Sequence, residues 1–328
     1  MSAAHPLVSI ITPSFNQAPY LEYTIQSVLR QEYPHLEYLV IDGGSTDGSL
    51  AILEKYAGRF AWWVSEADHG QAEAINKGFR RAKGEIIAWL NSDDLYLPGA
   101  IHQAVAALHQ NPEADMVFGD ALTIDSTGKP LNELRFGDWG LEEFKKFRMI
   151  CQPAVFMRRK ALPPDNLLDE SYHFMLDHQL WLNIASRHPV RHAPALWAAA
   201  RHHPQAKNAA QAARFSAETL RLLDWMQADP IFQARNRLDY RKMAGGAYRL
   251  SARYLLDGGQ AGPALRDYLR ALVNTPGYAL RHWHRMAYAM MSLIGLRQAS
   301  QWYYRLNKAP DLSGYPQLHG WPGLAANS

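Results

Sequence analysis

Polar side chains that can bind cations or accept protons follow four short apolar segments in the first third of the chain. Each segment is rich in β-branched or aromatic residues and ends at turn-forming residues, which predicts a strand. The polar groups are Thr12-Pro13-Ser14-Phe15-Asn16, Asp42-Gly43-Gly44-Ser45-Thr46-Asp47-Gly48, Ser65-Glu66-Ala67-Asp68 and Asn91-Ser92-Asp93-Asp94. Because ligands bind at the carboxyl ends of the strands in open α/β sheets, we expect all four groups on one rim.

The carboxylates among these groups need a positive partner, because clustered carboxylates repel one another. A divalent cation meets this need: Mg²⁺ and Mn²⁺ prefer hard oxygen ligands and commonly bridge one or two carboxylates to substrate phosphates. Asp93 and Asp94 therefore fit a metal–diphosphate site. A local alternative exists for each group, since Asp47 or Ser45 could cap the next helix and the Asp93-Asp94 pair could be turn residues.

Strands and helices must alternate to place these groups on one rim. The predicted strands are 7–12, 36–41, 60–65 and 85–90, with a fifth opening at Met116, and helical spacing fills 19–31, 49–56, 71–82 and 98–109. This alternation predicts an α/β fold with a mainly parallel sheet covered on both faces. After residue 208 strand patterns vanish, and residues 248–276 read as a helical hairpin.

Composition divides the chain into parts. Residues 1–206 hold 18 Lys and Arg against 24 Asp and Glu, whereas residues 207–308 hold 16 against 6. We therefore expect an acidic first domain over 1–207, a basic helical region over 208–310 and a loose tail over 311–328. The single cysteine, Cys151, excludes an internal disulfide framework and a cysteine-rich zinc site.

The basic region allows two interpretations. Its Arg-rich, aromatic stretches, such as Tyr278 to Tyr304, could lie on an anionic membrane surface, or form a bundle that packs on the first domain with a solvated basic face. No nucleic-acid-binding motif accompanies the charge. The start of the chain lacks a signal-peptide pattern and no apolar run reaches the roughly 18 residues of a membrane span. We therefore expect a cytoplasmic protein, with peripheral contact at the inner face of the membrane as the second interpretation.

Residues 8–119 resemble the nucleotide-binding half of family 2 glycosyltransferases with the GT-A fold. The resemblance rests on the order of five stretches: VSIITPSFNQ, TIQSVLRQ, YLVIDGGSTDGS, WVSEADHGQAEAINKGF and GEIIAWLNSDDLYLPGA. It implies an inverting, non-processive transferase that moves a sugar from a nucleotide-sugar, with UDP preferred, to an acceptor hydroxyl. The implied acceptor is a glycan or a lipid-linked glycan in cell-surface polysaccharide or glycolipid assembly.

The resemblance also implies roles for the matching residues. The nucleotide-binding residues would be Pro13, Asn16, Asp42, Asp68, Asn76, Lys77 and Asp93. Asp94 would be the direct ligand of Mg²⁺ or Mn²⁺, with Asp93 beside it. His202 would reach the metal or the diphosphate, and His203 could serve instead; the alternative is that this His pair lies in a solvated loop.

Asp177 is the candidate catalytic base, because an acidic residue opens a helix before a Leu-Trp pair at Leu180-Trp181, as in the family. Many members carry two adjacent acids here, whereas Leu176 precedes Asp177. The alternative is that Asp177 caps this helix, a role that is compatible with catalysis. Asp169 and Glu170 are the reserve candidates.

Three other classes fit the sequence less well. A dehydrogenase needs Gly-x-Gly-x-x-Gly after its first strand, and a sugar nucleotidyltransferase needs a Gly-rich, Arg-containing loop there, but Pro13-Ser14-Phe15-Asn16 follows instead. A processive synthase would carry Gln-x-x-Arg-Trp and membrane spans. A non-enzymatic nucleotide-binding or scaffold protein that uses the basic half for interactions remains the alternative, and it leaves the acidic rim without a role.

Overall fold

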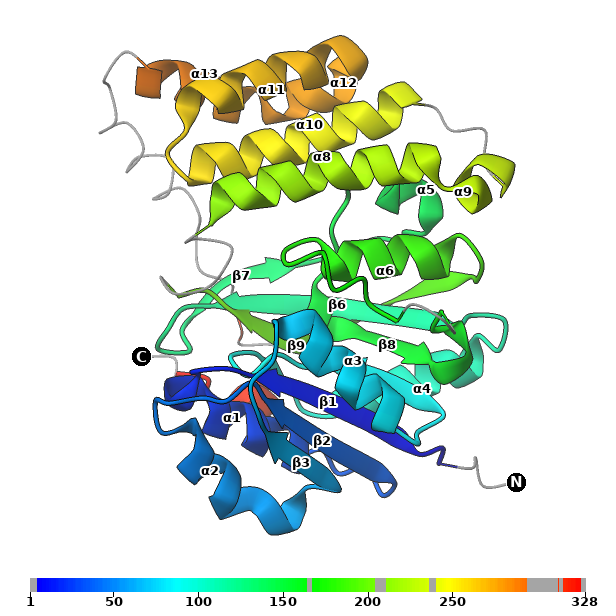
Figure 1. The fold of residues 1–328 in the computed structure, drawn as a ribbon, viewed down its shortest axis with the longest axis vertical. Helices are drawn as coiled ribbons and strands as arrows, with labels where there is room; N and C mark the ends of the chain where they lie inside the picture. Colours follow the sequence, from blue (N-terminus) through cyan, green and yellow to red (C-terminus); the bar gives the residue numbers. More distant parts are fainter. Residues whose placement is uncertain are drawn as a thin grey trace.

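The computed structural model describes residues 5–163, 167–203, 211–235, 240–293, 312 and 315–325, and shows a sheet domain below a stack of helices (Figure 1). The strands are β1 (Val8–Ser14), β2 (Leu36–Asp42), β3 (Trp62–Ser65), β4 (Ile86–Trp89), β5 (Leu95–Tyr96), β6 (Met116–Ile124), β7 (Pro130–Leu134), β8 (Val155–Arg158) and β9 (Val190–Arg201). The helices of the sheet domain are α1 (Ala18–Leu29), α2 (Ser49–Tyr56), α3 (Gln71–Arg81), α4 (Ala100–Gln110), α5 (Leu141–Phe144) and α6 (Leu176–Ala185). The C-terminal helices are α8 (Ala212–Ala228), α9 (Pro230–Arg235), α10 (Tyr240–Asp257), α11 (Ala261–Asn274), α12 (Pro276–Ala279) and α13 (Trp283–Leu293).

Within the described residues, all strands join one sheet in the order β3-β2-β1-β4-β8-β6-β9-β5, with β7 on β6. The pairs among β1, β2, β3 and β4 are parallel, as the alternation of strands and helices predicts. The expectation of a mainly parallel sheet is wrong for the other half. There β8 is antiparallel to β4 and β6, and β5 is antiparallel to β9, so only the β6–β9 pair is parallel.

β1 continues beyond its predicted end and includes Pro13. On one side β1 pairs with β2 along its whole length, but on the other side its pairing with β4 stops at Ile11. A proline lacks the N–H that a second neighbouring strand would need, so it is tolerated where the strand has become an edge. The free edge beyond Ile11 is also where the rim of the sheet begins.

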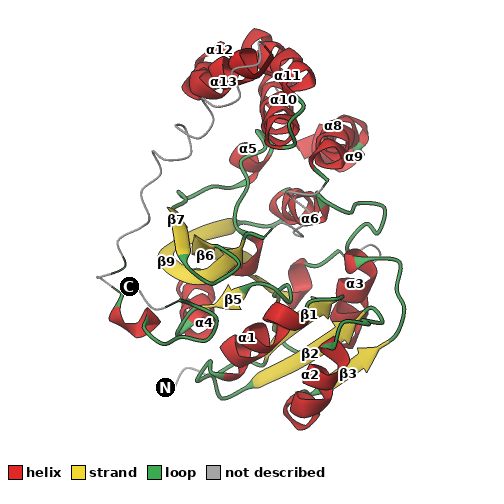
Figure 2. Cartoon of the chain, turned by 90° about the vertical axis from the view of Figure 1, so that its left-hand side faces the viewer, coloured by secondary structure: helices red, strands yellow, loops and turns green. Residues whose placement is uncertain are grey.

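The central strands bury both faces, because successive side chains of a strand point to opposite sides. Val8 and Ile10 of β1 pack in a core with α1 and α4, whereas Ile11 packs in a second core with α3 and α6. Figure 2, which views the sheet nearly edge-on, shows helices on either side of it. This double covering fixes the strand ends and therefore the positions of the polar loops.

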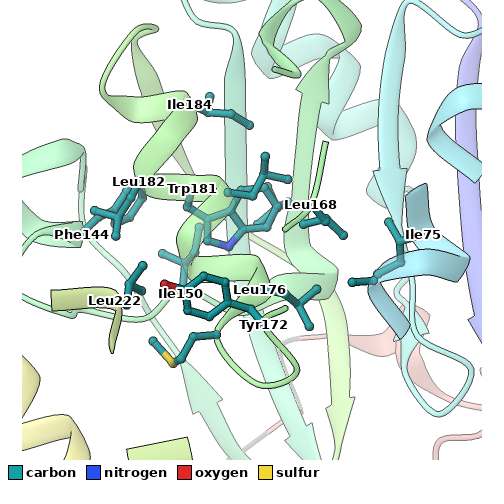
Figure 3. Close-up of a cluster of buried hydrophobic side chains, with 14 of the residues drawn as sticks. Ile75, Phe144, Ile150, Leu168, Tyr172, Leu176, Trp181, Leu182, Ile184 and Leu222 are labelled. Atoms are coloured by element: carbon teal, nitrogen blue, oxygen red, sulfur yellow. The ribbon is translucent and has the colours of Figure 1, made fainter. Parts of the chain in front are cut away.

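The C-terminal helices share the second core with the sheet domain. Trp181 of α6 lies among Ile75 of α3, Phe144 of α5 and Leu222 of α8 (Figure 3), and all four side chains are buried. The indole of Trp181 also stacks on Trp89 of β4, with ring centroids 5.1 Å apart. The bundle interpretation of the basic region is therefore the one that the packing favours. The predicted boundary at residues 207–208 lies outside the described residues.

The hairpin expected over residues 248–276 is confirmed as α10 and α11, which turn at Gly258 and Gly259. No described helix is both long and apolar enough to cross a bilayer.

The expectation of a loose tail is wrong for residues 315–325, which dock on the sheet domain. Trp321 Nε1 donates to the Tyr96 carbonyl at 2.7 Å, and Ala325 N donates to the Gly128 carbonyl at 3.0 Å. Leu318 is buried in a small core with residues of β5, β6 and β9. Burial of these apolar side chains gives the segment a fixed place despite its Gly- and Pro-rich sequence.

Candidate active site

The loops that follow β1 and β2 are tied to each other at the rim. Asn16 N donates to Ser45 Oγ and Thr46 N donates to Asn16 Oδ1, each at 2.8 Å. Asn16 has a φ of 52°, a left-handed conformation that asparagine tolerates better than most residues. With Pro13 at the end of β1, Asn16 therefore lies at the strand end where the sequence placed it.

Asp42 ends β2 and is fully buried. Its carboxylate accepts hydrogen bonds from Gly44 N at 3.1 Å, Ser45 N at 2.8 Å, Ser45 Oγ at 2.5 Å and Ser65 Oγ at 2.7 Å. These donors satisfy the buried charge. Asp42 therefore organises the loop after β2, and its contact with a nucleotide base stays a prediction.

Asp68 lies directly over the loop after β2. A Cβ built on Gly43 would come within 2.7 Å of Asp68 Oδ2, so only glycine leaves room for this carboxylate. Burial raises the pKa of Asp68, and Gly70 N donates to its Oδ1 at 2.9 Å. Lys77, also predicted at the nucleotide, donates to Glu66 Oε1 at 2.5 Å beside this loop. Both residues lie at the rim, and their contact with a nucleotide stays a prediction.

Asn76 makes three hydrogen bonds within the protein, and the nucleotide contact that the resemblance implies stays a prediction. Its side chain is buried in α3, where Nδ2 donates to the Leu168 carbonyl and to Glu170 Oε1, and Oδ1 accepts from Leu168 N, all at 2.9 Å. Both N–H groups of the amide donate within the protein, and Oδ1 accepts one hydrogen bond. Asn76 thus fastens the segment that precedes α6 to α3.

Asp93 and Asp94 follow β4 and differ in environment. Asp94 is buried, and its Oδ1 accepts from Arg201 N at 2.9 Å while Oδ2 accepts from Asn91 Nδ2 at 3.3 Å. Burial, and next the charge of Asp93, raise the pKa of Asp94 well above its ordinary value. Asp93 is more open, and its Oδ2 lies 3.1 Å from His203 Nε2.

This pair fits the divalent cation that the sequence predicts. The two neighbouring carboxylates repel each other, and a bound cation would stabilise both charged forms. Carboxylate oxygens with one imidazole are a donor set that Mn²⁺ accepts. The described residues contain no closed group of three or more His, Cys, Asp or Glu side chains around one point. His203 is the imidazole against Asp93, whereas His202 is exposed, and its role as a ligand stays a prediction.

Asp177 lies in the first turn of α6, as predicted. Burial raises the pKa of its carboxyl from 3.8 to about 6, and the charge of Glu218 adds to the rise. Oδ1 accepts a hydrogen bond from His178 N at 2.7 Å, which opposes the shift. A carboxylate with a pKa near the working pH suits a general base, so the position on α6 is compatible with both capping and catalysis.

Glu218 of α8 anchors the segment that carries Asp177. Its carboxylate accepts hydrogen bonds from the backbone N–H groups of residues 173–175 at 2.8 to 3.1 Å. Arg221, one turn later, donates to the Ser171 carbonyl at 3.1 Å. A carboxylate before the first turn of a helix also interacts favourably with the helix dipole. The C-terminal region therefore helps to build the site, which the sequence did not indicate.

Cys151 and Gln152 are buried next to each other just before β8. The charges of Asp94 and Asp177 both act on the Cys151 thiol and, after burial itself, raise its pKa. Gln152 Nε2 donates to the Trp89 carbonyl at 2.8 Å. Its buried Oε1 has no hydrogen-bond partner among the described residues, which makes it a ready acceptor for a ligand hydroxyl.

Arg201, like Glu218, contributes to the site although the sequence analysis assigns it no role. At the end of β9, its side chain donates to the carbonyls of Asp93 at 3.0 Å, Asp125 at 3.0 Å and Gly323 at 3.2 Å. Its backbone N–H holds Asp94. Arg201 thereby fixes the Asp93–Asp94 turn to β9, the β6–β7 turn and the docked tail.

Known proteins are similar in sequence or in fold to the part of the chain that carries these residues. Residues 9–162 match the model of Glycosyl transferase family 2. The putative teichuronic acid biosynthesis glycosyltransferase TuaG of Bacillus subtilis is 37% identical over 131 residues, which cover 39% of this chain and 52% of the relative. The glycosyltransferase Rv1514c of Mycobacterium tuberculosis is 43% identical over 116 residues, 35% of this chain and 44% of the relative. The chain spans between a fifth and about half of the length of these and the other first curated relatives.

Two solved structures resemble nearly the whole chain. The mannosyltransferase PcManGT from Pyrobaculum calidifontis, in complex with GDP-Man and Mn²⁺, has a TM-score of 0.59 at 19% identity, covering 89% of this chain and 87% of that one. S. aureus TarS 1-349, in complex with UDP-GlcNAc, has a TM-score of 0.59 at 16% identity, covering 91% of each chain. Residues 9–162 are therefore similar to glycosyl transferase family 2, and the sheet domain has the GT-A fold.

Proposed function

We propose that the protein is an inverting, metal-dependent glycosyltransferase that moves a sugar from a nucleotide-sugar, with UDP preferred, to an acceptor hydroxyl. The observation that carries this proposal is the pair of acidic sites: Asp93 and Asp94 after β4, held against His203 and Arg201, and Asp177 in the first turn of α6, whose pKa burial raises to about 6. The family match supports sugar transfer. The GDP-Man and UDP-GlcNAc in the similar structures support a nucleotide-sugar donor.

The donor would occupy the rim formed by the loops after β1, β2, β3 and β4. Pro13, Asn16, Asp42 and Asp68 border the nucleotide end, and Asp93 with Asp94 lies at the diphosphate end. A Mg²⁺ or Mn²⁺ ion held by Asp94, Asp93 and an imidazole would offset the negative charge that grows on the leaving diphosphate. The Mn²⁺ in the PcManGT structure supports this cofactor.

Asp177 would act on the acceptor. As the acceptor oxygen attacks the anomeric carbon, its proton passes to the Asp177 carboxylate, and the bond from the anomeric carbon to the diphosphate oxygen breaks. Attack from the face opposite the leaving group inverts the anomeric centre and needs no nucleophile from the protein. The buried Cys151 thiol, whose pKa burial raises, fits a site without a covalent step.

The curated relative TuaG supports a place in polysaccharide assembly. We propose a glycan or lipid-linked glycan as the acceptor, used on the cytoplasmic side of the membrane. The alternative, a non-enzymatic nucleotide-binding or scaffold protein, predicts no turnover of any donor.

The test is donor turnover. Wild-type protein with Mn²⁺ is incubated with a panel of UDP-, GDP- and dTDP-sugars, and the released nucleoside diphosphate and the anomeric form of the sugar are measured by NMR. The proposal expects release from one nucleotide class with inverted configuration, and release must fall in Asp177→Asn. Turnover with retained configuration would refute the mechanism, and no turnover of any donor would favour the scaffold alternative.

A further inference from the structure

Arg249 of α10 is a buried cation that has no counter-ion among the described residues. Its residue surface is 8% exposed, and its Nη2 donates to the Phe147 carbonyl at 2.9 Å. Its Nε is buried and has no hydrogen-bond partner in the described part of the chain. None of the carboxylates in the described part of the chain lies within ion-pair distance of it. A buried guanidinium is costly unless it is paired, so an anion would complete this site.

Other arginines gather around Arg249 rather than carboxylates. The Tyr278 ring lies 5.3 Å from the Arg249 guanidinium and 5.7 Å from that of Arg148. The charges of Arg253 and Arg285 both disfavour the charged form of Arg249 and, after burial, lower its pKa. We refer to Arg148, Arg249, Arg253 and Arg285 as the junction cluster, because Arg249 of α10 binds Phe147 in the segment after α5 and Tyr278 of α12 lies beside Arg148 and Arg249.

In the described part of the chain, Asp257 and Glu143 partly offset the four guanidinium groups. Asp257 lies 3.7 Å from Arg253 Nε and 3.3 Å from Arg285 Nη1, and Glu143 lies 2.9 Å from Arg148 Nε. His282 adds no charge near neutral pH, because burial and then the charges of Arg249 and Arg285 lower its pKa to about 4. The junction cluster therefore keeps a positive balance, and Arg253 remains 46% exposed for a ligand to reach.

The junction cluster borders the acceptor side of the proposed active site. Arg249 and Arg253 are four residues apart, so they share one face of α10. The next residue, Tyr254, stacks on Phe215 with ring centroids 3.9 Å apart, and the charge of Asp177 contributes to raising its pKa to about 12, after burial. The carboxyl end of α10 thus reaches the surroundings of the candidate base.

We propose that the junction cluster binds a phosphate group of the acceptor, so that the acceptor is a phosphate-bearing glycan or lipid. This inference rests on the proposed glycosyl transfer. Guanidinium groups match phosphate oxygens in pairs and are weakly hydrated, which suits a site at a buried junction. A bound phosphate gives Arg249 its missing counter-ion and holds the acceptor hydroxyl near Asp177.

Arg249 also has a structural task that any test must separate from binding. It fastens the Phe147 carbonyl, and Phe147 has a left-handed φ of 56°. Close contact continues at Gly246, where a Cβ would come within 2.1 Å of the Lys146 carbonyl. Substitution of Arg249 therefore risks loosening the junction, so the exposed Arg253 is the better probe.

The test is titration with inorganic phosphate by calorimetry, in chloride buffer without divalent metal, which leaves the donor diphosphate site without its cation. Wild type is compared with Arg253→Gln, Arg249→Gln and the matched control Arg266→Gln, whose side chain on α11 is 64% exposed and lies next to Asp267. We expect a Kd on the order of 1–10 mM for wild type, weakened about tenfold in Arg253→Gln and unchanged in Arg266→Gln. Equal binding by wild type and Arg253→Gln, or no binding by wild type, would overturn the inference.

A second arm identifies the source of the phosphate. Co-sedimentation with phosphatidylglycerol vesicles, but not with phosphatidylcholine vesicles, that is lost in Arg253→Gln would indicate a lipid-borne phosphate. Phosphate binding without co-sedimentation would indicate a phosphate on a soluble glycan; both results support phosphate binding by the junction cluster.

Nucleotide binding with Mn²⁺ is measured on the same samples. If UDP, GDP or dTDP binds but phosphate does not, only this inference fails, whereas wild type that binds none of the three nucleotides would defeat the proposed function itself.

Discussion

Asp177→Asn is expected to abolish transfer while making the folded protein more stable. Burial raises the pKa of Asp177 from 3.8 to about 6, which corresponds to roughly 3 kcal/mol at about 1.36 kcal/mol per pKa unit. Between these two pH values the folded chain keeps a proton that the unfolded chain has released. The contribution of the Asp177 carboxyl to the free energy of unfolding is therefore largest below pH 3.8 and is lost as the pH rises through about 6.

Asparagine avoids the free-energy cost of burying a charged carboxylate, because it is neutral at every pH. Its Oδ1 can still accept the hydrogen bond from His178 N. At pH 8 we expect the free energy of unfolding to rise by about 1–3 kcal/mol in Asp177→Asn, the lower values reflecting partial solvent access, and to be unchanged near pH 3. Donor turnover should fall by roughly 10²–10⁴, the usual contribution of a general base.

The measurements are urea unfolding at pH 3 and pH 8 and the pH profile of donor turnover, whose acidic limb should have its midpoint near pH 6 in wild type. Asp169→Asn is the control, because Asp169 is the reserve candidate and its Oδ1 is held by Ser171 N at 2.9 Å. The reasoning is refuted if Asp177→Asn keeps wild-type turnover while Asp169→Asn loses it. It is also refuted if Asp177→Asn is no more stable than wild type at pH 8.

Other consequences concern the anchor of α6, the packing of α3 and the metal. Glu218→Gln should lower the free energy of unfolding by about 1–3 kcal/mol, because a charged acceptor of three backbone N–H groups becomes neutral. It should also move the acidic limb of the pH profile of turnover to lower pH, because the charge of Glu218 raises the pKa of Asp177. An acidic limb that does not move would contradict this. Gly78→Ala should destabilise the folded protein by about 1–3 kcal/mol in urea unfolding, because its Cβ would lie 2.5 Å from Ile11 Cγ2. Gly58→Ala is the control: a Cβ there has nothing within 4 Å, so stability should change by less than about 0.5 kcal/mol. Equal effects of the two substitutions would show that the contact between α3 and β1 is not tight. Chelation of divalent cations should lower donor turnover by about 10²-fold, restored by Mn²⁺, and full turnover in EDTA would exclude the metal.

The sequence was sufficient for the parallel half of the sheet and for its polar rim. Apolar runs of β-branched residues bounded by turn residues fix β1, β2 and β4 locally, and the loop residues Asn16, Asp42 and Asp93 follow from where the strands end. The other half depends on partners far along the chain. β6 pairs with β9, more than 60 residues away, and no local pattern shows whether such a pair is parallel.

The site residues that the sequence missed act through distant contacts. Arg201 and Glu218 look like ordinary surface charges in the sequence, but each of them fixes backbone in another part of the chain. Asn76 likewise makes contacts that the sequence does not indicate, since its amide nitrogen donates to the Leu168 carbonyl and to Glu170 Oε1. Such assignments require the tertiary structure, because hydrogen-bonding capacity can be counted only when all neighbours are known.

The central claim, a nucleotide-sugar site built on Asp94, is tested most directly by calorimetric titration of UDP, GDP and dTDP with and without Mn²⁺. Wild type is compared with Asp94→Asn, in which the carboxylate is replaced by an amide of nearly the same size. We predict that one nucleotide binds wild type in the presence of Mn²⁺ and that this metal-dependent binding is lost in Asp94→Asn. Binding that is identical in both proteins, or absent in wild type under every condition, would contradict the account.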